Sequence, residues 1–296
     1  MQNSIKIWVG ETGGYKLLDS GNKQKLEEIG GVKIVRAEPR AWWDKSLPDS
    51  EWQGVKTGLE EVIDIGMGGI KAKIKYKGSS KHIGIFPEQF SQWRYIAERI
   101  KNHETQDASV KLNILNLFGY TGIASLVAAK ASLCRVETSF GLAKTGSRVT
   151  HVDGSKQSVD WARENQKLSG MEDAPIRWIV DDVIKFIKKE KSRGVKYDAI
   201  IMDPPSYGKG PKGEVWKIEE QLPELLESCR QILSDQPLFV IFNMYSTELS
   251  SLSLSNLLSD MVKGLNGTIE CGELAIKQEN SERLLPLSIF ALWCAN

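Results

Sequence analysis

The segment DAIIMDPPSYG, residues 198–208, carries side chains whose types and order suit work on a polar ligand. Pro204 and Pro205 directly follow a run of apolar residues, so they would fix a rigid turn at the end of a buried strand. Such a turn presents the Asp203 carboxylate to a cleft, where it could accept a hydrogen bond from a planar target with an amine group. Tyr207 could stack on the face of that target. An ordinary turn is the alternative interpretation, because Asp-Pro pairs initiate turns in many proteins.

Two earlier apolar runs also end in residues that could hold a nucleotide. The first is followed by the turn NLFGYTG, 116–122, in which Gly119 and Gly122 allow close approach of a ligand to the backbone. A tight structural turn explains these glycines equally well. The second run ends at Asp153, whose carboxylate could accept both hydroxyls of a ribose, or could cap the helix that follows.

A third run ends at Asp181 and Asp182. There a side-chain acceptor and the backbone amide of Val183 could read the edge of an adenine, although an Asp at this point is also a common helix cap. These loops would lie together if their strands are parallel neighbours, because ligands bind outside the carboxyl ends of such strands. Four successive loops with binding residues favour the functional interpretation of Asp203.

The chain between these motifs alternates apolar runs with amphipathic segments, which predicts an α/β fold with a doubly wound, mostly parallel sheet. A helix near 250–264 and two final strands without a helix between them predict an antiparallel C-terminal pair. Residues 1–84 read as a small β-rich N-terminal domain, with strands at GGVKIVRAEP, at IKAKIKY and at HIGIF. Helical spacing predicts a bridging helix at 85–103, before the main domain at 104–296.

Composition limits the possible environments and ligands. The formal charge of +1 excludes a strong field over the whole molecule, so any nucleic-acid surface must be a local patch. The four cysteines are far apart and form no set with metal-ligand spacing, so no metal is expected. No apolar run is long enough for a membrane span, and no export signal is recognisable, so we expect a cytoplasmic protein with no membrane contact.

The segments LNLFGYTG, VTHVDGS, DDVIKF and DPPSYG resemble the successive motifs of class I S-adenosylmethionine-dependent methyltransferases, which have a Rossmann-like fold. The resemblance is strongest to the bacterial large-subunit (23S) ribosomal RNA methyltransferase group. Some of its members carry an FPEQ segment and a GEVW segment, found here at 86–89 and 213–216. The resemblance covers nearly all of the second domain.

This resemblance implies a cofactor, S-adenosyl-L-methionine, and a set of residues around it. Residues 118–121 would line its methionine side, Asp153 would hold the ribose, Asp182 the adenine amine, and the HIGIFPEQ segment would fold over it. The implied cofactor-binding set is Phe86, Gln89, Asn116, Phe118, Gly119, Tyr120, Thr121, Gly122, Asp153, Gly154, Ser155, Asp182, Val183 and Asp203. The implied catalytic set, which would act on the methyl acceptor, is Asp203, Pro204, Pro205 and Tyr207.

Two features depart from the family pattern. The 30 residues between Gly122 and Asp153 exceed the roughly 20 of a compact unit. The excess predicts an insertion at 132–144, either a surface loop or an extension of the preceding helix. The N-terminal segment also shows no recognisable RNA-binding module.

The identity of the acceptor depends on the cysteines. Methylation of cytosine C5 needs a thiolate beside the cleft, and neither the DPPSY motif nor the end of the fifth strand, FNMYS, offers one. A nitrogen acceptor needs no covalent intermediate, so we expect methylation of a base nitrogen in RNA, with ribosomal RNA as the favoured partner. A lysine-rich stretch at 185–193, Lys209, Lys212 and five tryptophans before residue 94 are compatible with RNA, although solvated lysines and core tryptophans explain them as well.

Three other classes of function remain open from the sequence. The acceptor could be a protein or a small molecule. A nicotinamide-dependent enzyme would share the glycine turn and Asp153, but it would not need DPPSY, and the third glycine of GxGxxG is missing. A non-catalytic RNA-binding scaffold would bind RNA without methyl transfer. The sequence carries no indication of the oligomeric state.

Overall fold

A computed structural model describes residues 5–53, 55–78, 82–106, 111–132, 135–138, 141–144, 147–245 and 248–296. Its main feature is an eight-stranded sheet. In spatial order the strands are β1 (Lys6–Gly10), β16 (Gly267–Lys277), β17 (Leu284–Ala295), β15 (Phe239–Met244), β12 (Ala199–Met202), β7 (Asn113–Leu117), β10 (Arg148–Asp153) and β11 (Ile176–Val180). The five strands from β15 to β11 are parallel, while β17 is antiparallel to both of its neighbours.

The order of these strands reverses at the centre of the sheet. The chain starts at β7, moves outward through β10 to β11, and returns to β12 on the other side of β7. This reversal opens a crevice at the carboxyl ends of β7 and β12, the usual ligand position in such sheets. The predicted fold class, including the antiparallel C-terminal pair, is confirmed.

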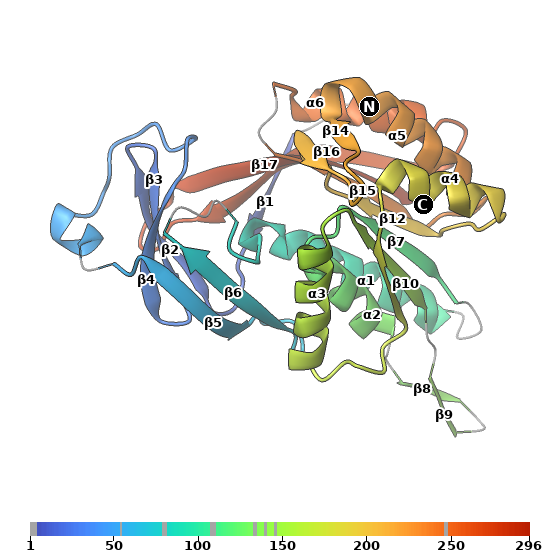
Figure 1. The fold of residues 1–296 in the computed structure, drawn as a ribbon, viewed down its shortest axis with the longest axis horizontal. Helices are drawn as coiled ribbons and strands as arrows, with labels where there is room; N and C mark the ends of the chain where they lie inside the picture. The colour runs from blue at the N-terminus through green and yellow to red at the C-terminus, as the bar shows by residue number, and fades with distance from the viewer. Residues whose placement is uncertain are drawn as a thin grey trace.

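Helices cover both faces of the sheet (Figure 1). One face carries α1 (Phe90–Gln106), α2 (Ile123–Ser132) and α3 (Lys156–Leu168), and the other carries α4 (Val183–Ser192), α5 (Ile218–Ile232) and α6 (Ser251–Met261). Alternate residues of the central strands enter two separate cores, with Ile114 packing on the α1–α2 side and Leu115 on the α4–α6 side. Burial on both faces explains why these strands read as continuous apolar runs.

The N-terminal region forms two smaller antiparallel sheets beside the large one (Figure 1). One contains β2 (Tyr15–Gly21), β3 (Gln24–Ile29) and β4 (Val32–Ala37), and the other pairs β5 (Gly58–Asp64) with β6 (Lys71–Lys77); the short helix η1 (Asp49–Trp52) lies between β4 and β5 in the chain. The end of β16 reaches this region, where Leu17 pairs with Gln278 and Ser20 N donates to Gln278 Oε1 over 3.1 Å. The residue that follows β16 therefore links the large sheet to the small domain.

Three local expectations were wrong. Residues 6–10, assigned to the small domain, form β1 of the large sheet, because they pair in parallel with β16. HIGIF is no strand: Gly84 has a φ of +105° and lies against the indole of Trp161, so the chain turns there. The described part of the expected insertion is neither a loop nor a helix extension, since β8 (Arg135–Thr138) and β9 (Gly141–Lys144) form an antiparallel pair. The segment expected to bridge the domains begins with the short helix η2 (Pro87–Gln89) and continues as α1.

Candidate active site

A cavity of about 320 Å³ opens at the carboxyl ends of β7, β10, β11 and β12, at the reversal of strand order. This volume is at the lower end of the range for small-molecule sites. We call it the central cleft. Of the residues predicted from the sequence, it is lined by Phe86, Phe118, Tyr120, Asp153, Gly154, Ser155, Asp182, Val183, Asp203, Pro204 and Pro205.

The turn after β7 holds two aromatic side chains at the cleft by means of an unusual backbone. Phe118 and Tyr120 have φ angles of 56° and 50°, in the left-handed region that side chains rarely adopt. A Cβ at Gly119 would overlap the imidazole of His151, and one at Gly122 would lie 2.8 Å from the Ala162 Cβ. The two glycines are therefore required by packing, and Phe118 and Tyr120 line the cleft.

Asp153 stabilises this turn from the end of β10. Its Oδ2 accepts from the Tyr120 amide over 2.9 Å, and its Oδ1 accepts from the Ser155 amide over 2.8 Å. Burial raises the pKa of the carboxyl group, against the lowering effect of these two donors. The cap of α3 is Ser155, which accepts from the Ser158 amide over 3.2 Å, so Asp153 is not the helix cap.

At the end of β11 the helix-cap interpretation holds. Asp182 is the N-cap of α4, because its Oδ1 accepts from the Lys185 amide over 2.9 Å. Asp182 and Val183 still line the cleft together with Asp181, so the first turn of α4 faces the cavity. Capping and ligand contact are compatible here, because the second carboxylate oxygen of Asp182 is not used by the cap.

The GEVW segment, residues 213–216, supports the turn after β12. Trp216 is buried, its indole nitrogen donates to the Pro205 carbonyl over 2.6 Å, and its ring packs on Phe118 at 5.0 Å between centroids. The strands β13 (Tyr207–Lys209) and β14 (Val215–Lys217) form the hairpin that brings Trp216 to this position. The Asp203 turn and the Phe118 turn are thus held against one another through a single indole.

Asp203 belongs to a chain of hydrogen bonds that leads from the cleft to Glu88. Gln89 Nε2 donates to Asp203 Oδ2 over 2.8 Å and to the Tyr245 hydroxyl over 3.1 Å, and that hydroxyl donates to Glu88 Oε1 over 2.8 Å. Burial raises the pKa of Asp203 to about 7, the Gln89 donor opposes the shift, and the charge of Glu88 adds to it. Burial also raises the pKa of Glu88, against the opposing effect of Lys25. Two carboxyl groups with raised pKa values are linked through one amide and one phenol.

Sequence reasoning missed Glu88 and Tyr245. Tyr245 directly follows β15, so the rule that selected Asp153 and Asp203, reading the residue after each strand, would have found it. Glu88 lies inside the FPEQ segment, where only its neighbours Phe86 and Gln89 were selected. His82, which begins the HIGIFPEQ segment expected to fold over the cofactor, and Trp216 of the GEVW segment also line the cleft.

The remaining predicted residues lie around the cleft and are absent from its lining. Asn116 is buried and donates to Ser125 Oγ over 2.9 Å, and Thr121 is buried and donates to the Gly84 carbonyl over 2.7 Å. Gln89 contacts the site through Asp203. Tyr207, on β13, is 55% exposed and does not line the cleft. Its role toward an acceptor remains a prediction.

A doubly wound sheet with acidic groups after successive strands defines a nucleotide-type cofactor site, and comparisons identify which kind. No family model matches the chain. The crystal structure of an S-adenosylmethionine-dependent methyltransferase from Agrobacterium tumefaciens is 35% identical, covers 100% of this chain and 95% of its own, and superposes with a TM-score of 0.87. The chain therefore belongs to the S-adenosylmethionine-dependent methyltransferases, and its cofactor is S-adenosylmethionine.

Curated relatives match over part of their length. Ribosomal RNA large subunit methyltransferase I of Klebsiella pneumoniae (strain 342) is 31% identical over 136 residues, which are 46% of this chain and 28% of the relative. Ribosomal RNA large subunit methyltransferase K/L of Shewanella frigidimarina is 31% identical over 141 residues, 47% of this chain and 18% of the relative. The matched region spans less than a third of the length of these relatives.

Proposed function

We propose that this methyltransferase acts on a nitrogen atom of a base in RNA, with ribosomal RNA as the favoured substrate. The observation that carries the proposal is the Asp203-Pro204-Pro205 turn, which places a carboxyl group at the cleft beyond the cofactor-side loops of β7, β10 and β11. The names of the matched relatives, which refer to large-subunit ribosomal RNA, support the choice of polymer.

The central cleft suits the cofactor in size and in the chemistry of its walls. Bound S-adenosylmethionine supplies a methyl group on a sulfonium centre. We assign Asp153 to the ribose hydroxyls, Asp182 and the Val183 amide to the adenine edge, and Phe118 and Tyr120 to the methionine side. Gly119, Thr121 and Gly122 act through the turn that they build, and Phe86 covers the site from the FPEQ segment. The arrangement holds the donor at one end of the cleft and leaves Asp203 free to orient an acceptor at the other.

The positions of the cysteines favour methylation of a nitrogen atom over methylation of a pyrimidine C5. Among the described residues, Cys229 and Cys271 are buried in α5 and β16, Cys294 lies in β17, and none of the three lines the central cleft. Burial also raises the pKa of Cys229, which opposes formation of a thiolate. A covalent addition to C5 of a pyrimidine would need such a thiolate. A nitrogen acceptor needs only a positioned lone pair, and positioning alone can supply a large part of the rate.

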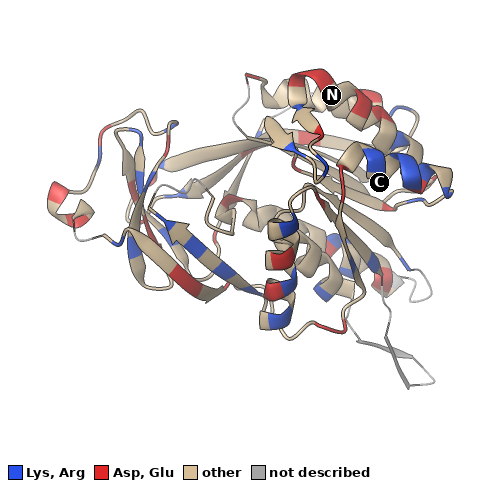
Figure 2. Cartoon of the chain, in the orientation of Figure 1, with Lys and Arg blue, Asp and Glu red and all other residues tan. Residues whose placement is uncertain are grey.

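The predicted basic stretch on α4 is not a free cationic surface. Lys185, Lys188 and Lys189 form ion pairs with Glu214, Glu224 and Asp181 at 2.5, 2.7 and 2.6 Å. Figure 2 shows acidic and basic residues interspersed on α3 as well. Trp52 and Trp93 are core residues, and Trp42 is the exposed exception at 76%. RNA contact on the described surface therefore depends more on individual side chains than on a strong positive field.

The test is mass spectrometry of nucleosides from ribosomal RNA of a strain that lacks the protein and of its parent. We expect one N-methylated nucleoside to be lost on deletion and restored by the wild-type gene, but not by Asp203→Ala. Purified protein should transfer a labelled methyl group from S-adenosylmethionine to ribosomal RNA of the deletion strain. Binding of RNA without transfer would support the scaffold function, and transfer to protein alone would exclude the RNA assignment.

A further inference from the structure

A second cavity, of about 570 Å³, lies between the small β domain and the FPEQ segment. It shares His82, Phe86 and Tyr245 with the central cleft, so the two hollows have a common wall. Its other side is formed by β3, β4 and the chain after β4, where Lys25, Glu38 and Trp42 reach it. We call this hollow the domain cavity. Its volume has room for a nucleotide-sized group.

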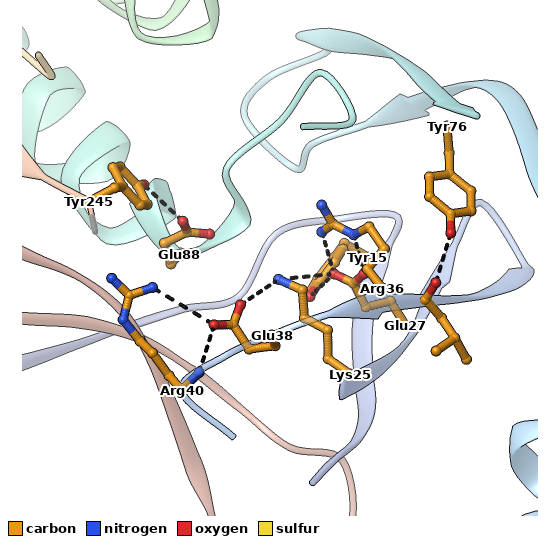
Figure 3. Close-up of polar contacts among 10 residues, drawn as sticks. Tyr15, Lys25, Glu27, Arg36, Glu38, Arg40, Tyr76, Glu88 and Tyr245 are labelled. Carbon is orange, nitrogen blue, oxygen red and sulfur yellow. Dashed lines mark hydrogen bonds and ion pairs between the residues drawn. The ribbon is translucent and has the colours of Figure 1, made fainter. Parts of the chain in front are cut away.

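The small-domain side of the domain cavity carries charged side chains that pair with one another (Figure 3). Glu27, fully buried, accepts from Arg36 at 2.5 and 2.6 Å, and Lys25 lies 3.7 Å from it. Burial tends to raise the pKa of Glu27, but the two cations outweigh this effect and hold the pKa at about 2. Glu38 in turn pairs with Lys25 at 3.3 Å and with Arg40 at 3.8 Å. A wall of paired charges is better matched to an uncharged, polar ligand than to an isolated anion.

The opposite side of the cavity carries groups that connect to the reaction centre. Glu88 is only 3% exposed, and Figure 3 shows it with Tyr245 facing the Lys25–Glu38–Arg40 chain. Glu88 accepts from Tyr245, and Tyr245 accepts from Gln89, which donates to Asp203. The hydrogen-bond chain therefore begins in the domain cavity and ends in the central cleft.

The mouth of the cavity carries an aromatic ring that the core does not use. Trp42 has the largest exposed fraction, 76%, among the exposed large apolar side chains of the described residues. The ammonium group of Lys23 lies 4.6 Å from the centroid of its ring. Exposed aromatic rings beside cations are typical platforms for unpaired bases, because a base can stack on the ring while the cation approaches the phosphate.

We propose that the domain cavity receives an unstacked base next to the methyl acceptor in the RNA, while the acceptor itself enters the central cleft at Asp203. Trp42 stacks on the neighbouring base at the mouth, and the Glu88 carboxylate accepts a hydrogen bond from an N–H of that base. Enzymes that modify a base also contact the nucleotides that flank it. The proposal rests on the proposed RNA substrate and adds where the flanking base binds and which residues outside the DPPSY motif hold it.

The experiment measures methyl transfer from S-adenosylmethionine to large-subunit ribosomal RNA purified from the deletion strain. Trp42→Ala should raise the KM for this RNA about tenfold, whereas Trp42→Phe should restore most of the wild-type value. Glu88→Gln keeps an oxygen for the Tyr245 hydroxyl and should lower kcat/KM at least tenfold. The affinity for S-adenosylhomocysteine, measured by calorimetry, should stay within about twofold of wild type in all three variants.

Two control variants make comparable substitutions at residues that line neither cavity. Leu252→Ala truncates an exposed apolar side chain on α6, and Glu104→Gln changes a buried glutamate that bonds to Ser147. Both should keep the wild-type KM for RNA. If wild-type protein transfers methyl groups to RNA and the Trp42 and Glu88 variants do so with wild-type constants, the domain cavity does not bind the flanking base. If they lose S-adenosylhomocysteine binding, the cavity belongs to the cofactor. If wild-type protein transfers no methyl group to RNA, both this proposal and the RNA substrate are wrong.

Discussion

Asp203→Asn should separate the effect of the Asp203 carboxylate on the stability of the fold from its effect on methyl transfer. Asparagine has the same shape, can still accept from Gln89 Nε2, and carries no charge at any pH. In the folded protein the pKa of Asp203 is raised from its ordinary 3.8 to about 7, first by burial and then by the charge of Glu88. The folded state therefore holds a proton between about pH 4 and 7 that the unfolded chain has released. By linkage, the free energy of unfolding falls as pH rises through this window.

The size of the effect follows from the shift. Three pH units at about 1.4 kcal/mol each give an upper limit of about 4 kcal/mol. The Asp203 side chain is only partly buried in the cleft wall, so water reduces this limit to roughly 2–3 kcal/mol. Asp203→Asn should match wild type near pH 4 and be more stable by that amount near pH 8. Urea unfolding followed by circular dichroism at several pH values measures the difference.

The same substitution should abolish the functional pH dependence. Methyl transfer to ribosomal RNA should rise in wild type with a midpoint near pH 7, because the ionised carboxylate accepts the hydrogen bond from the acceptor. In Asp203→Asn the activation free energy of methyl transfer should be higher by about 2.7–4 kcal/mol, and the rate should not change with pH. Asp173→Asn, which removes an exposed aspartate before β11, is the matched control. A stability difference between Asp203→Asn and wild type that does not change with pH would refute the reasoning.

Three further changes test the rest of the site. Asp153→Ala should weaken binding of S-adenosylhomocysteine ten- to hundredfold in calorimetry, because it removes charge-assisted bonds of about 1.5–3 kcal/mol; unchanged affinity would leave Asp153 only the role of bracing the Tyr120 turn. Gly119→Ala should destabilise the protein by about 1–3 kcal/mol in thermal unfolding, since its methyl group meets His151, whereas Gly58→Ala, whose nearest neighbour would be 3.7 Å away, should not show this overpacking effect. Tyr207→Ala should raise the KM for RNA more than it lowers kcat, and Tyr207→Phe should be mild; equal kinetics in all three proteins would show that this exposed ring does not meet the substrate.

The sequence predicted the architecture well where local pattern and long-range packing agree. Strands buried on both faces must be mainly apolar, and β7, β12 and β15 have that character, so their order along the chain could be read directly. The terminal antiparallel pair was predictable because the loop between its strands has no room for a crossover helix. These features depend on residues within a few positions of one another.

The errors concern pairings between distant segments. Nothing in KIWVG indicates that β1 pairs with β16, more than 260 residues later in the chain, rather than with β2. HIGIF has the composition of a strand, but Gly84 packs on Trp161 of α3 and bends it. Glu88 was not predicted, because its environment depends on Tyr245 and Lys25. Only folding brings these two residues near it. Such contacts leave no local trace in the sequence.

The carboxylates of the small domain and those of the candidate active site differ in their partners. Glu27 is fully buried, but its direct contact with Arg36 and Lys25 compensates for the loss of water, and its pKa falls to about 2. Asp203 and Glu88 accept from an amide and a phenol, form no ion pair with any residue that the structure describes, and have raised pKa values. A group kept in this state opposes stability, so a structural role does not account for it. Asp203 lines the central cleft and Glu88 lines the domain cavity, so one hydrogen-bond chain through Gln89 and Tyr245 connects the site of methyl transfer with the second hollow.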